Sequence, residues 1–313
     1  MSARKTREVI EVDGREIELT NTGKVLFPQA GLTKGELIGY YRRIAPTMLP
    51  HIAGRPLSFE RYPDGIETNG FMQKNASDYF PSWIRRARLA KEDGEVEHVV
   101  ADDAATLVYL ANQACVTLHV GLARVDRIHH PDRLVIDLDP SDEDFDKVKR
   151  AARAARRLLE ATGLVPFVQI TGSRGLHVWV PLEPQATFDQ VRGFAGDLAD
   201  RLVAHSPEEL TTEQRKAKRG TRVFVDVARN AYGQTAVAPY SVRPRPEAPV
   251  ATPLAWAELD DPGLGPGRYT ITNLFRRLGQ KPDPWAEFGR HARPLAAARE
   301  RLAALPAQDS PRS

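Results

Sequence analysis

The middle of the chain predicts an α+β fold built on the order β-α-β-β-α-β, the ferredoxin-like or RRM-like arrangement. Three observations lead to this prediction. Short runs of branched and aromatic residues favour buried strands, two longer segments keep apolar residues at helical spacing, and turn or capping residues separate them. The chain has 313 residues, 42% of them hydrophobic and 27% charged, which is enough to bury a sizeable core.

The predicted core elements follow one another without long gaps. They are a strand at 133–139, a helix at 144–161 that Gly163 stops, a strand at 165–170, a turn at 171–175, a strand at 176–180, a helix at 188–204 and a strand at 222–228. Thr187 and Gln190 have the spacing of a capping box at the start of the second helix. In this topology the first strand is central, between the third and the fourth.

Other elements frame this core. Residues 33–49 are predicted to form an amphipathic helix that Thr33 and Glu36 cap, and Pro46 and Pro50 are predicted to bend or end it. A further helix is predicted at 104–113, and the proline-rich stretch 239–253 is predicted to be extended.

Acidic residues on the first and fourth predicted strands indicate a metal site. A strand points residues i and i+2 to one face, so Asp137 and Asp139 should project together. Asp226 on the fourth strand and His177 on the third should join them on that face. Carboxylates this close repel one another, and a hard divalent cation such as Mg²⁺ or Mn²⁺ removes the conflict. The alternative is a strand that simply runs out into the acidic loop at 141–144.

Two further segments have the chemistry of a phosphate site. The turn Thr171-Gly172-Ser173-Arg174-Gly175 offers backbone amides, a hydroxyl and a guanidinium. A dense basic run at 215–222 leads into the fourth strand. A plain hairpin and a solvated charged face are the alternative interpretations of these two segments.

Composition narrows the class of protein. The formal net charge of +3 is only mildly basic and does not by itself indicate nucleic acid. No segment reaches the roughly 18 uninterrupted apolar residues of a membrane span, and residues 1–7 lack the apolar core of a signal peptide. The single cysteine, Cys115, lies in an apolar stretch that predicts burial. These features predict a protein of the reducing cytoplasm, with no membrane partner.

Taken in order, a set of short motifs resembles the polymerase domain of the bacterial non-homologous end-joining DNA ligase D family, which belongs to the archaeo-eukaryotic primase superfamily. The resemblance covers residues 19–278. Its motifs are Leu19-Thr20-Asn21, Lys24-Val25-Leu26-Phe27-Pro28, His51-Ile52-Ala53-Gly54-Arg55-Pro56, Leu118-His119-Val120, Asp137-Leu138-Asp139-Pro140, Thr171-Gly172-Ser173-Arg174-Gly175-Leu176-His177, Val223-Phe224-Val225-Asp226 and Ala238-Pro239-Tyr240-Ser241-Val242-Arg243.

The resemblance implies roles for particular residues. Two divalent metal ions, Mn²⁺ and/or Mg²⁺, would be held by Asp137, Asp139 and Asp226. The incoming nucleotide would be contacted by His119, Ser173, Arg174, His177, Arg219 and Arg243. The DNA 5′-phosphate at the downstream edge of a gap would be bound by Asn21, Lys24 and Lys34. Template bases would be contacted by Phe71 and Arg61.

Two positions depart from the family pattern. Met72 stands where a second aromatic residue is common, which predicts weaker stacking on the template. Glu60 stands where relatives carry a basic residue, so one phosphate contact is placed in doubt, although Arg61 is adjacent.

The resemblance implies template-directed addition of nucleotides, preferably ribonucleotides, to 3′-hydroxyl ends at gaps or double-strand breaks during end joining. It implies gapped or broken double-stranded DNA with a 5′-phosphate, nucleoside and deoxynucleoside triphosphates, an end-joining DNA ligase and Ku-type end-binding proteins as partners, and a location in the cytoplasm at the nucleoid. The alternatives are a metal-dependent nuclease or phosphotransferase and a non-catalytic module that binds DNA ends.

The expected organisation is a single primase-polymerase domain at 1–295. Within it we expect an N-terminal α/β lobe at 1–130, a catalytic core at 131–245 and a C-terminal extension at 246–295 that packs on the core. Residues 296–313 are expected to be a flexible tail. Lys91-Glu92-Asp93-Gly94 has the form of a ligase nucleotidyl-accepting lysine but is predicted to be a surface turn. No ligase or phosphoesterase segment is found, so a stand-alone polymerase domain is expected.

Overall fold

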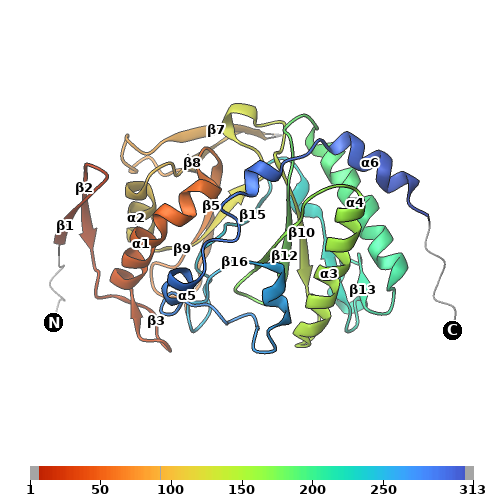
Figure 1. Cartoon of the computed structure of the whole chain (residues 1–313). Helices are drawn as coiled ribbons and strands as arrows, with labels where there is room; N and C mark the ends of the chain where they lie inside the picture. Colours follow the sequence, from red (N-terminus) through yellow and green to blue (C-terminus); the bar gives the residue numbers. More distant parts are fainter. Residues whose placement is uncertain (1–6, 92, 307–313) are drawn as a thin grey trace. The chain divides into compact units, whose positions relative to one another are not determined.

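The computed structural model of the chain describes residues 7–91 and 93–306 (Figure 1). These residues divide into two units. The first comprises the described residues up to Gly121 together with Val237–Ala251 and Tyr269–Lys281. The second comprises Leu122–Ala236, Thr252–Arg268 and the described residues from Pro282 onward.

The first unit combines a six-stranded sheet with three helices. The sheet has the order β15-β9-β5-β8-β7, and β6 pairs with β5 outside this path. The bounds are β1 (Arg7–Val12), β2 (Arg15–Thr20), β3 (Val25–Phe27), β4 (Leu32–Thr33), α1 (Lys34–Ile52), β5 (Pro56–Arg61), β6 (Phe71–Gln73), β7 (Arg86–Lys91), β8 (Gly94–Val100), α2 (Ala104–Asn112), β9 (Cys115–Gly121) and α5 (Leu274–Gln280), with β15 (Thr235–Val237) at the boundary.

Helix α1 begins as predicted and ends later than predicted. Thr33 and Glu36 form the capping box, with both reciprocal hydrogen bonds present. The helix does not end at Pro46 or Pro50 but continues to Ile52. Buried side chains on both sides of Pro50, including Met48 and Ile52, hold this last turn against the core. Tertiary packing therefore outweighs the hydrogen bonds that the two prolines remove.

The segment Val237–Ala251 belongs to the first unit because buried hydroxyl groups tie it there. The Tyr40 hydroxyl donates to the carbonyl oxygen of Tyr240 at 2.7 Å. The Ser241 hydroxyl accepts from the backbone amide of Leu118 at 2.7 Å. Helix α5 joins the same unit, since Phe275 packs on Tyr40 with ring centroids 5.7 Å apart. The boundaries therefore differ from the predicted lobe at 1–130, core at 131–245 and extension at 246–295 that packs on the core.

The second unit contains the predicted β-α-β-β-α-β core, and Figure 1 shows α3 and α4 side by side. Its sheet has the order β13-β14-β10-β12-β11-β16, so the first predicted strand, β10, lies between the third and the fourth as expected. The bounds are β10 (Arg133–Asp139), α3 (Phe145–Ala161), β11 (Phe167–Ile170), β12 (Leu176–Pro181), α4 (Phe188–His205), β13 (Leu210–Thr211), β14 (Val223–Asp226), β16 (Thr252–Leu254) and α6 (Leu295–Ala304), with short 3₁₀ helices at Val125–Arg127, Lys216–Lys218, Ala228–Asn230, Trp256–Asp260 and Phe288–His291.

Local signals set the ends of the two core helices as predicted. Asp144 caps α3, and Gly163 follows its end with a φ of 80°. Thr187 and Gln190 form the predicted capping box of α4. The edge strands β13 and β16 were not predicted, because two- and three-residue strands carry little periodic pattern.

The predicted flexible tail at 296–313 is wrong for its described part. Helix α6 runs from Leu295 to Ala304, and Leu295, Ala298 and Leu302 are buried. The Arg301 guanidinium donates to the carbonyl oxygen of Thr162 at 3.2 Å, which fixes the helix at the end of α3. The alanine-rich composition therefore forms a packed helix. Residues 307–313 lie outside the described residues.

Two other sequence expectations fall partly outside the described residues. Lys91 ends β7 and Gly94 begins β8, as predicted for a turn, but Glu92 between them lies outside. Of the N-terminal segment without a signal-peptide core, residues 1–6 also lie outside. In the described part of the chain, none of the helices has both the length and the apolar character that crossing a bilayer requires.

A buried asparagine completes the pairing of β10 where β14 ends. Asn230 is fully buried, its amide oxygen accepts from the backbone amide of Val135 at 2.9 Å, and its amide nitrogen donates to the Val135 carbonyl at 2.7 Å. This side chain takes the place of a strand partner two residues before Asp137.

We predict that Asn230→Ala lowers the free energy of unfolding by about 2–4 kcal/mol, because two buried backbone groups lose their partners. Urea denaturation followed by circular dichroism measures the change. Gln185→Ala, at an exposed position, is the control and should leave stability unchanged. A variant at Asn230 as stable as the parent would show that β10 is held without this side chain.

Candidate active site

Strand register brings the predicted acidic residues onto one face of the second unit's sheet. Asp137 on β10 lies directly opposite Asp226 on β14, and on its other side lies opposite His177 on β12. Residues that face one another across antiparallel strands project from the same face. Asp139 shares this face with Asp137, since the two are two residues apart on one strand. The predicted convergence on one sheet face is confirmed.

A histidine and two arginines lie beside the carboxylates. The Nε2 atom of His177 lies 3.4 Å from a carboxylate oxygen of Asp137. Arg174 lies 3.3 Å from Asp139, and Arg219 lies 3.8 Å from it. Burial, opposed by the charge of Arg174, raises the pKa of the Asp139 carboxyl above its ordinary value, and the negative charge of Asp137 adds to the rise.

The donor set suits a hard divalent cation, because carboxylate oxygens are its preferred ligands. Directly opposed carboxylates on neighbouring strands also gain from a cation between them. The described residues contain no group of three or more His, Cys, Asp or Glu side chains already arranged to hold a metal ion. Asp226 accepts a hydrogen bond from the backbone amide of Ala228 at 2.8 Å, which engages one of its oxygens. The three carboxylates fit a divalent metal ion because they are oxygen ligands and project from the same face of the sheet.

The predicted phosphate turn packs directly on the end of β10. A Cβ atom at Gly175 would lie 2.0 Å from the carbonyl oxygen of Leu138, so only glycine allows this approach. The Thr171 hydroxyl accepts from the backbone amides of Ser173 and Gly175, both at 3.3 Å. Two of the amides expected to face a phosphate are thus already engaged inside the turn. The Ser173 and Arg174 side chains are the parts of it that remain partly or fully exposed.

Arg219 is held rigidly from three sides. It is 7% exposed, and its guanidinium donates to the carbonyl oxygens of Glu213 at 2.8 Å and Gln214 at 2.9 Å. The same group lies 3.6 Å from the centroid of the Phe224 ring. A cation fixed in this way beside Asp139 needs little reorganisation to stabilise a phosphate.

The other two predicted nucleotide residues, His119 and Arg243, lie in the first unit. His119 on β9 is 2.8 Å from a carboxylate oxygen of Glu60 on β5. Burial tends to raise the pKa of Glu60, but the hydrogen bond from His119 and the positive charges of His119 and Arg243 outweigh it, so the pKa is lowered. Glu60, which replaces an expected basic residue, is therefore an ionised partner of His119.

The three residues of the predicted 5′-phosphate pocket lie close together at the start of α1. The backbone amide of Lys34 donates to the carbonyl of Lys24 at 2.8 Å, and that of Lys24 donates to the carbonyl of Asn21 at 3.0 Å. The Lys34 side chain is 6% exposed and donates to the Asn112 carbonyl at 3.0 Å. Burial and the charge of Lys24 lower the pKa of Lys34 to about 8.

The predicted template residues also lie together in the first unit. Phe71 on β6 is 48% exposed, and the Arg61 guanidinium lies 5.5 Å from its ring centroid. Arg61 and Phe71 are direct neighbours across β5 and β6.

Two neighbours of the candidate residues were not predicted from the sequence: Gln169, which lies opposite His177, and Glu60 as the partner of His119. Gln169 lies opposite His177 on β11, is fully buried, and neither atom of its side-chain amide has a hydrogen-bond partner among the described residues. A polar residue in the apolar run Phe167-Val168-Gln169-Ile170 was the available signal. No local signal pairs Glu60 with His119, because 59 positions separate them.

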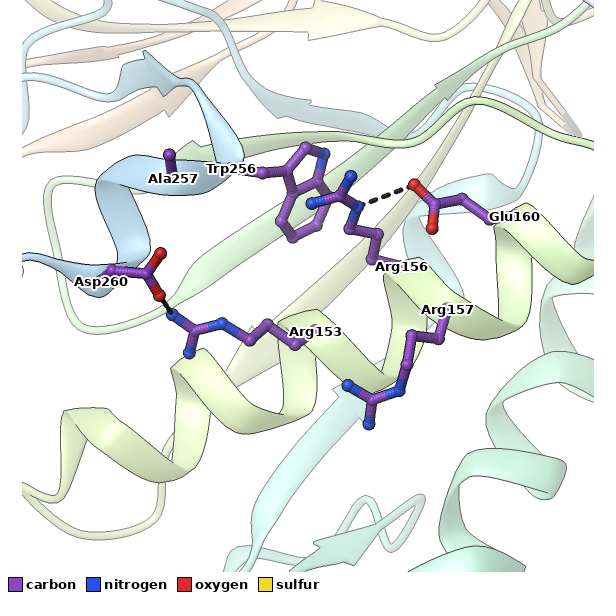
Figure 2. A pocket seen from close by; sticks show the side chains of 7 residues that line it. All are labelled: Arg153, Arg156, Arg157, Glu160, Trp256, Ala257 and Asp260. Atoms are coloured by element: carbon purple, nitrogen blue, oxygen red, sulfur yellow. Dashed lines mark hydrogen bonds and ion pairs between the residues drawn. The ribbon is translucent and has the colours of Figure 1, made fainter.

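A separate pocket of the second unit contains none of the predicted residues. It has a volume of about 360 Å³ and lies between α3 and the 3₁₀ helix Trp256–Asp260 (Figure 2). Arg153 pairs with Asp260 and Arg156 with Glu160, and the Arg156 guanidinium lies 4.9 Å from the Trp256 ring centroid. Since its lining residues largely neutralise one another, this pocket does not compete with the acidic face of β10 as the candidate site.

The acidic sheet face lies on a mixed α+β fold that a known family of polymerase domains shares. The model of the LigD primase-polymerase domain family matches residues 33–285. The chain therefore belongs to this family, whose members are metal-dependent nucleotidyltransferases.

Similar curated proteins and a similar solved structure support the same family. A multifunctional non-homologous end joining DNA repair protein LigD of Mycobacterium tuberculosis is 37% identical over 275 residues, covering 84% of this chain and 36% of that protein. A bifunctional LigD of Bacillus subtilis is 32% identical over 286 residues, covering 90% of this chain and 46% of that protein. The chain thus spans between a third and a half of these curated relatives. The polymerase domain of M. tuberculosis ligase D, solved in complex with DNA, matches with a TM-score of 0.82 at 34% identity and covers 88% of this chain and 99% of that one.

We predict that Asp226→Asn stabilises the protein by about 0.5 kcal/mol when divalent metals are chelated, because it removes one of two directly opposed like charges. Thermal unfolding in excess chelator measures this. Asp93→Asn, on an exposed turn, is the control and should have no effect. A loss of stability in Asp226→Asn would show that His177 and the arginines already overcompensate the pair.

Proposed function

We propose that this chain adds nucleotides to the 3′-hydroxyl ends of DNA under the direction of a template, at gaps or double-strand breaks that are repaired by end joining. The observation that carries the proposal is the opposition of Asp137 and Asp226 across β10 and β14, with Asp139 beside them and two arginines next to Asp139. Membership of the primase-polymerase domain family supports it.

In the proposed mechanism Asp137, Asp139 and Asp226 would hold two divalent metal ions, Mn²⁺ or Mg²⁺. When bound, such ions lower the pKa of the attacking hydroxyl and neutralise the leaving pyrophosphate. No side chain of the protein acts as a nucleophile.

The basic residues bind and orient the triphosphate. Arg174 and Arg219 now face Asp139. Their guanidinium groups would contact phosphate oxygens, together with the Ser173 hydroxyl and His177. Such prepositioned cations stabilise the charge that spreads over the transferring phosphoryl group. The family resemblance also implies nucleotide contacts for His119 and Arg243, which belong to the first unit.

The DNA side of the proposal rests on the first unit. Asn21, Lys24 and Lys34 would take the 5′-phosphate at the far edge of a gap. A buried lysine, Lys34, and an exposed one, Lys24, beside a helix N-terminus suit an anion. Phe71 would stack on template bases. A similar protein, the polymerase domain of M. tuberculosis ligase D, was solved with DNA, which supports DNA as the ligand.

The proposal also includes a preference for ribonucleotides. It further includes cooperation with an end-joining ligase and Ku-type proteins, and a location in the cytoplasm at the nucleoid. These features follow from the family resemblance. The relatives named as end-joining repair proteins support the assignment to that pathway.

We predict that Asp139→Ala lowers the rate of primer extension on a gapped duplex about 10³-fold or more, since it removes a carboxylate expected to hold metal. Binding to the same DNA should remain within a few-fold of the parent. Extension assays with ribo- or deoxynucleotides, in Mn²⁺ or Mg²⁺, and fluorescence anisotropy measure the two quantities.

The control is Asp142→Ala, which removes an acidic residue that pairs with Lys147 at 2.6 Å outside the triad. It should extend primers at the parent rate. Unchanged extension by Asp139→Ala would refute the metal assignment. DNA degradation without added nucleotides would instead indicate a nuclease, and tight end binding without incorporation a non-catalytic end-binding module.

We predict that preference for a 5′-phosphorylated gap weakens as pH rises through about 8. The pKa of Lys34 is lowered to about 8, and only the protonated amine attracts the phosphate. The charged fraction therefore falls from about 90% at pH 7 to about 10% at pH 9. The ratio of dissociation constants for unphosphorylated and phosphorylated gaps measures the preference at each pH.

Lys34→Met keeps a similar side-chain volume and should show a low, pH-independent ratio. Since both DNA substrates experience the same change of pH, general effects on DNA binding cancel. A ratio that stays constant in the parent protein would mean that Lys34 serves only to bond Asn112 and Thr20.

A further inference from the structure

Two exposed aromatic side chains of the first unit contact the same arginine, Arg61. Phe71 is 48% exposed and Tyr79 is 61% exposed, and both contact Arg61. Met72 is 49% exposed and pairs with Glu60, whereas the neighbouring Phe71 pairs with Arg61. Because successive residues of a strand point to opposite faces, Met72 projects from the other face of β6. The position expected to carry a second aromatic residue therefore points away from the face of Phe71, whereas Tyr79 contacts the same arginine as Phe71.

Arg61 connects the two rings. Its Nη1 atom donates to the Tyr79 hydroxyl at 2.9 Å and to the Gln73 side-chain oxygen at 3.0 Å. Its Nε atom donates to the carbonyl of Gln113 at 2.9 Å, and its guanidinium lies 5.5 Å from the Phe71 ring centroid. With most of its donors engaged, Arg61 acts as a positioning residue for the rings and has little capacity left for a phosphate.

The Tyr79 ring is held at its other end by the core. It packs edge-on against Phe80 with centroids 5.1 Å apart, and Phe80 is buried between Phe59 and Tyr109. The loop before it is fixed as well, because the Gln73 amide donates to the Asn75 carbonyl at 2.8 Å and to the Ser77 hydroxyl at 2.9 Å. A large, exposed ring with a fixed orientation loses little conformational entropy when it stacks on a flat ligand.

We propose that Tyr79 and Phe71 form a two-ring platform for the unpaired bases of a nucleic acid strand, oriented by Arg61. This inference rests on the proposed function, and it adds Tyr79 as a base-stacking residue and reassigns Arg61 from a template contact to a support. Unpaired bases are the ligand that the chemistry favours, since every base has a face that stacks on an aromatic ring and a polar rim that tolerates water. The platform reads no sequence.

The test uses a duplex with a single-stranded template overhang that carries the fluorescent base 2-aminopurine at successive positions. Stacking on an aromatic side chain quenches this base. The parent protein should quench one or two positions near the junction. Tyr79→Ala should relieve quenching at one of them and weaken overhang binding about 5- to 100-fold, the range for loss of one stacked base.

Three further variants separate stacking from folding. Tyr79→Phe keeps the ring and should keep most of the quenching. Phe71→Ala should relieve quenching at a different position from Tyr79→Ala. Tyr232→Ala, at a half-exposed tyrosine of the second unit that stacks on His129, is the matched control and should behave like the parent.

Unchanged quenching and affinity in Tyr79→Ala would overturn the proposal, as would quenching that Tyr232→Ala also relieves. The measurements need no catalysis, so they are independent of the proposed activity. Primer extension by the parent with no effect of Tyr79→Ala on quenching would refute the platform alone. Tyr79-dependent quenching in a parent protein that extends no primer would refute the activity and leave the platform.

Discussion

The candidate site depends on like charges that strand pairing holds opposite one another. Asp137 cannot move away from Asp226, because both belong to the backbone ladder between β10 and β14. Repulsion of this kind lowers the stability of the fold. The chain offsets it with the charges of Arg174 and Arg219, and His177 lies beside Asp137. An arrangement that is unfavourable by itself and favourable around a cation is what a metal-dependent nucleotidyltransferase requires.

Buried polar side chains hold irregular segments in place through hydrogen bonds, as backbone hydrogen bonds hold the strands in the sheets. Asn230 takes the place of a strand beside Val135, and Tyr40 and Ser241 bind the segment after β15 into the first unit. Arg61 has the same kind of role at the surface, where it orients Phe71 and Tyr79. In each case one side chain with several directional bonds fixes a loop that has no ladder of its own.

Sequence reasoning succeeded where a structure depends on neighbouring residues. The capping boxes at Thr33 and Thr187, the stop at Gly163 and the alternation along β10 are all local patterns. It failed where distant residues decide. The tail was expected to fray but forms α6, because Leu302 and its neighbours find a surface to pack on. The proline-containing end of α1 stays helical for the same reason. The pairing of His119 with Glu60 was not predicted because the two residues lie on different strands.

The sequence by itself determined the class of fold, the strand that carries the acidic pair and the family to which the chain belongs. Those features follow from periodicity, capping and ordered motifs, all of which can be seen along the chain. Tertiary structure alone decided the register that sets Asp226 directly opposite Asp137, the pairing of Glu60 with His119 and the contact of Tyr79 with the arginine that also contacts Phe71. The reason is that strand register, which selects the neighbours and the face of every side chain, is set by packing between segments far apart in the sequence.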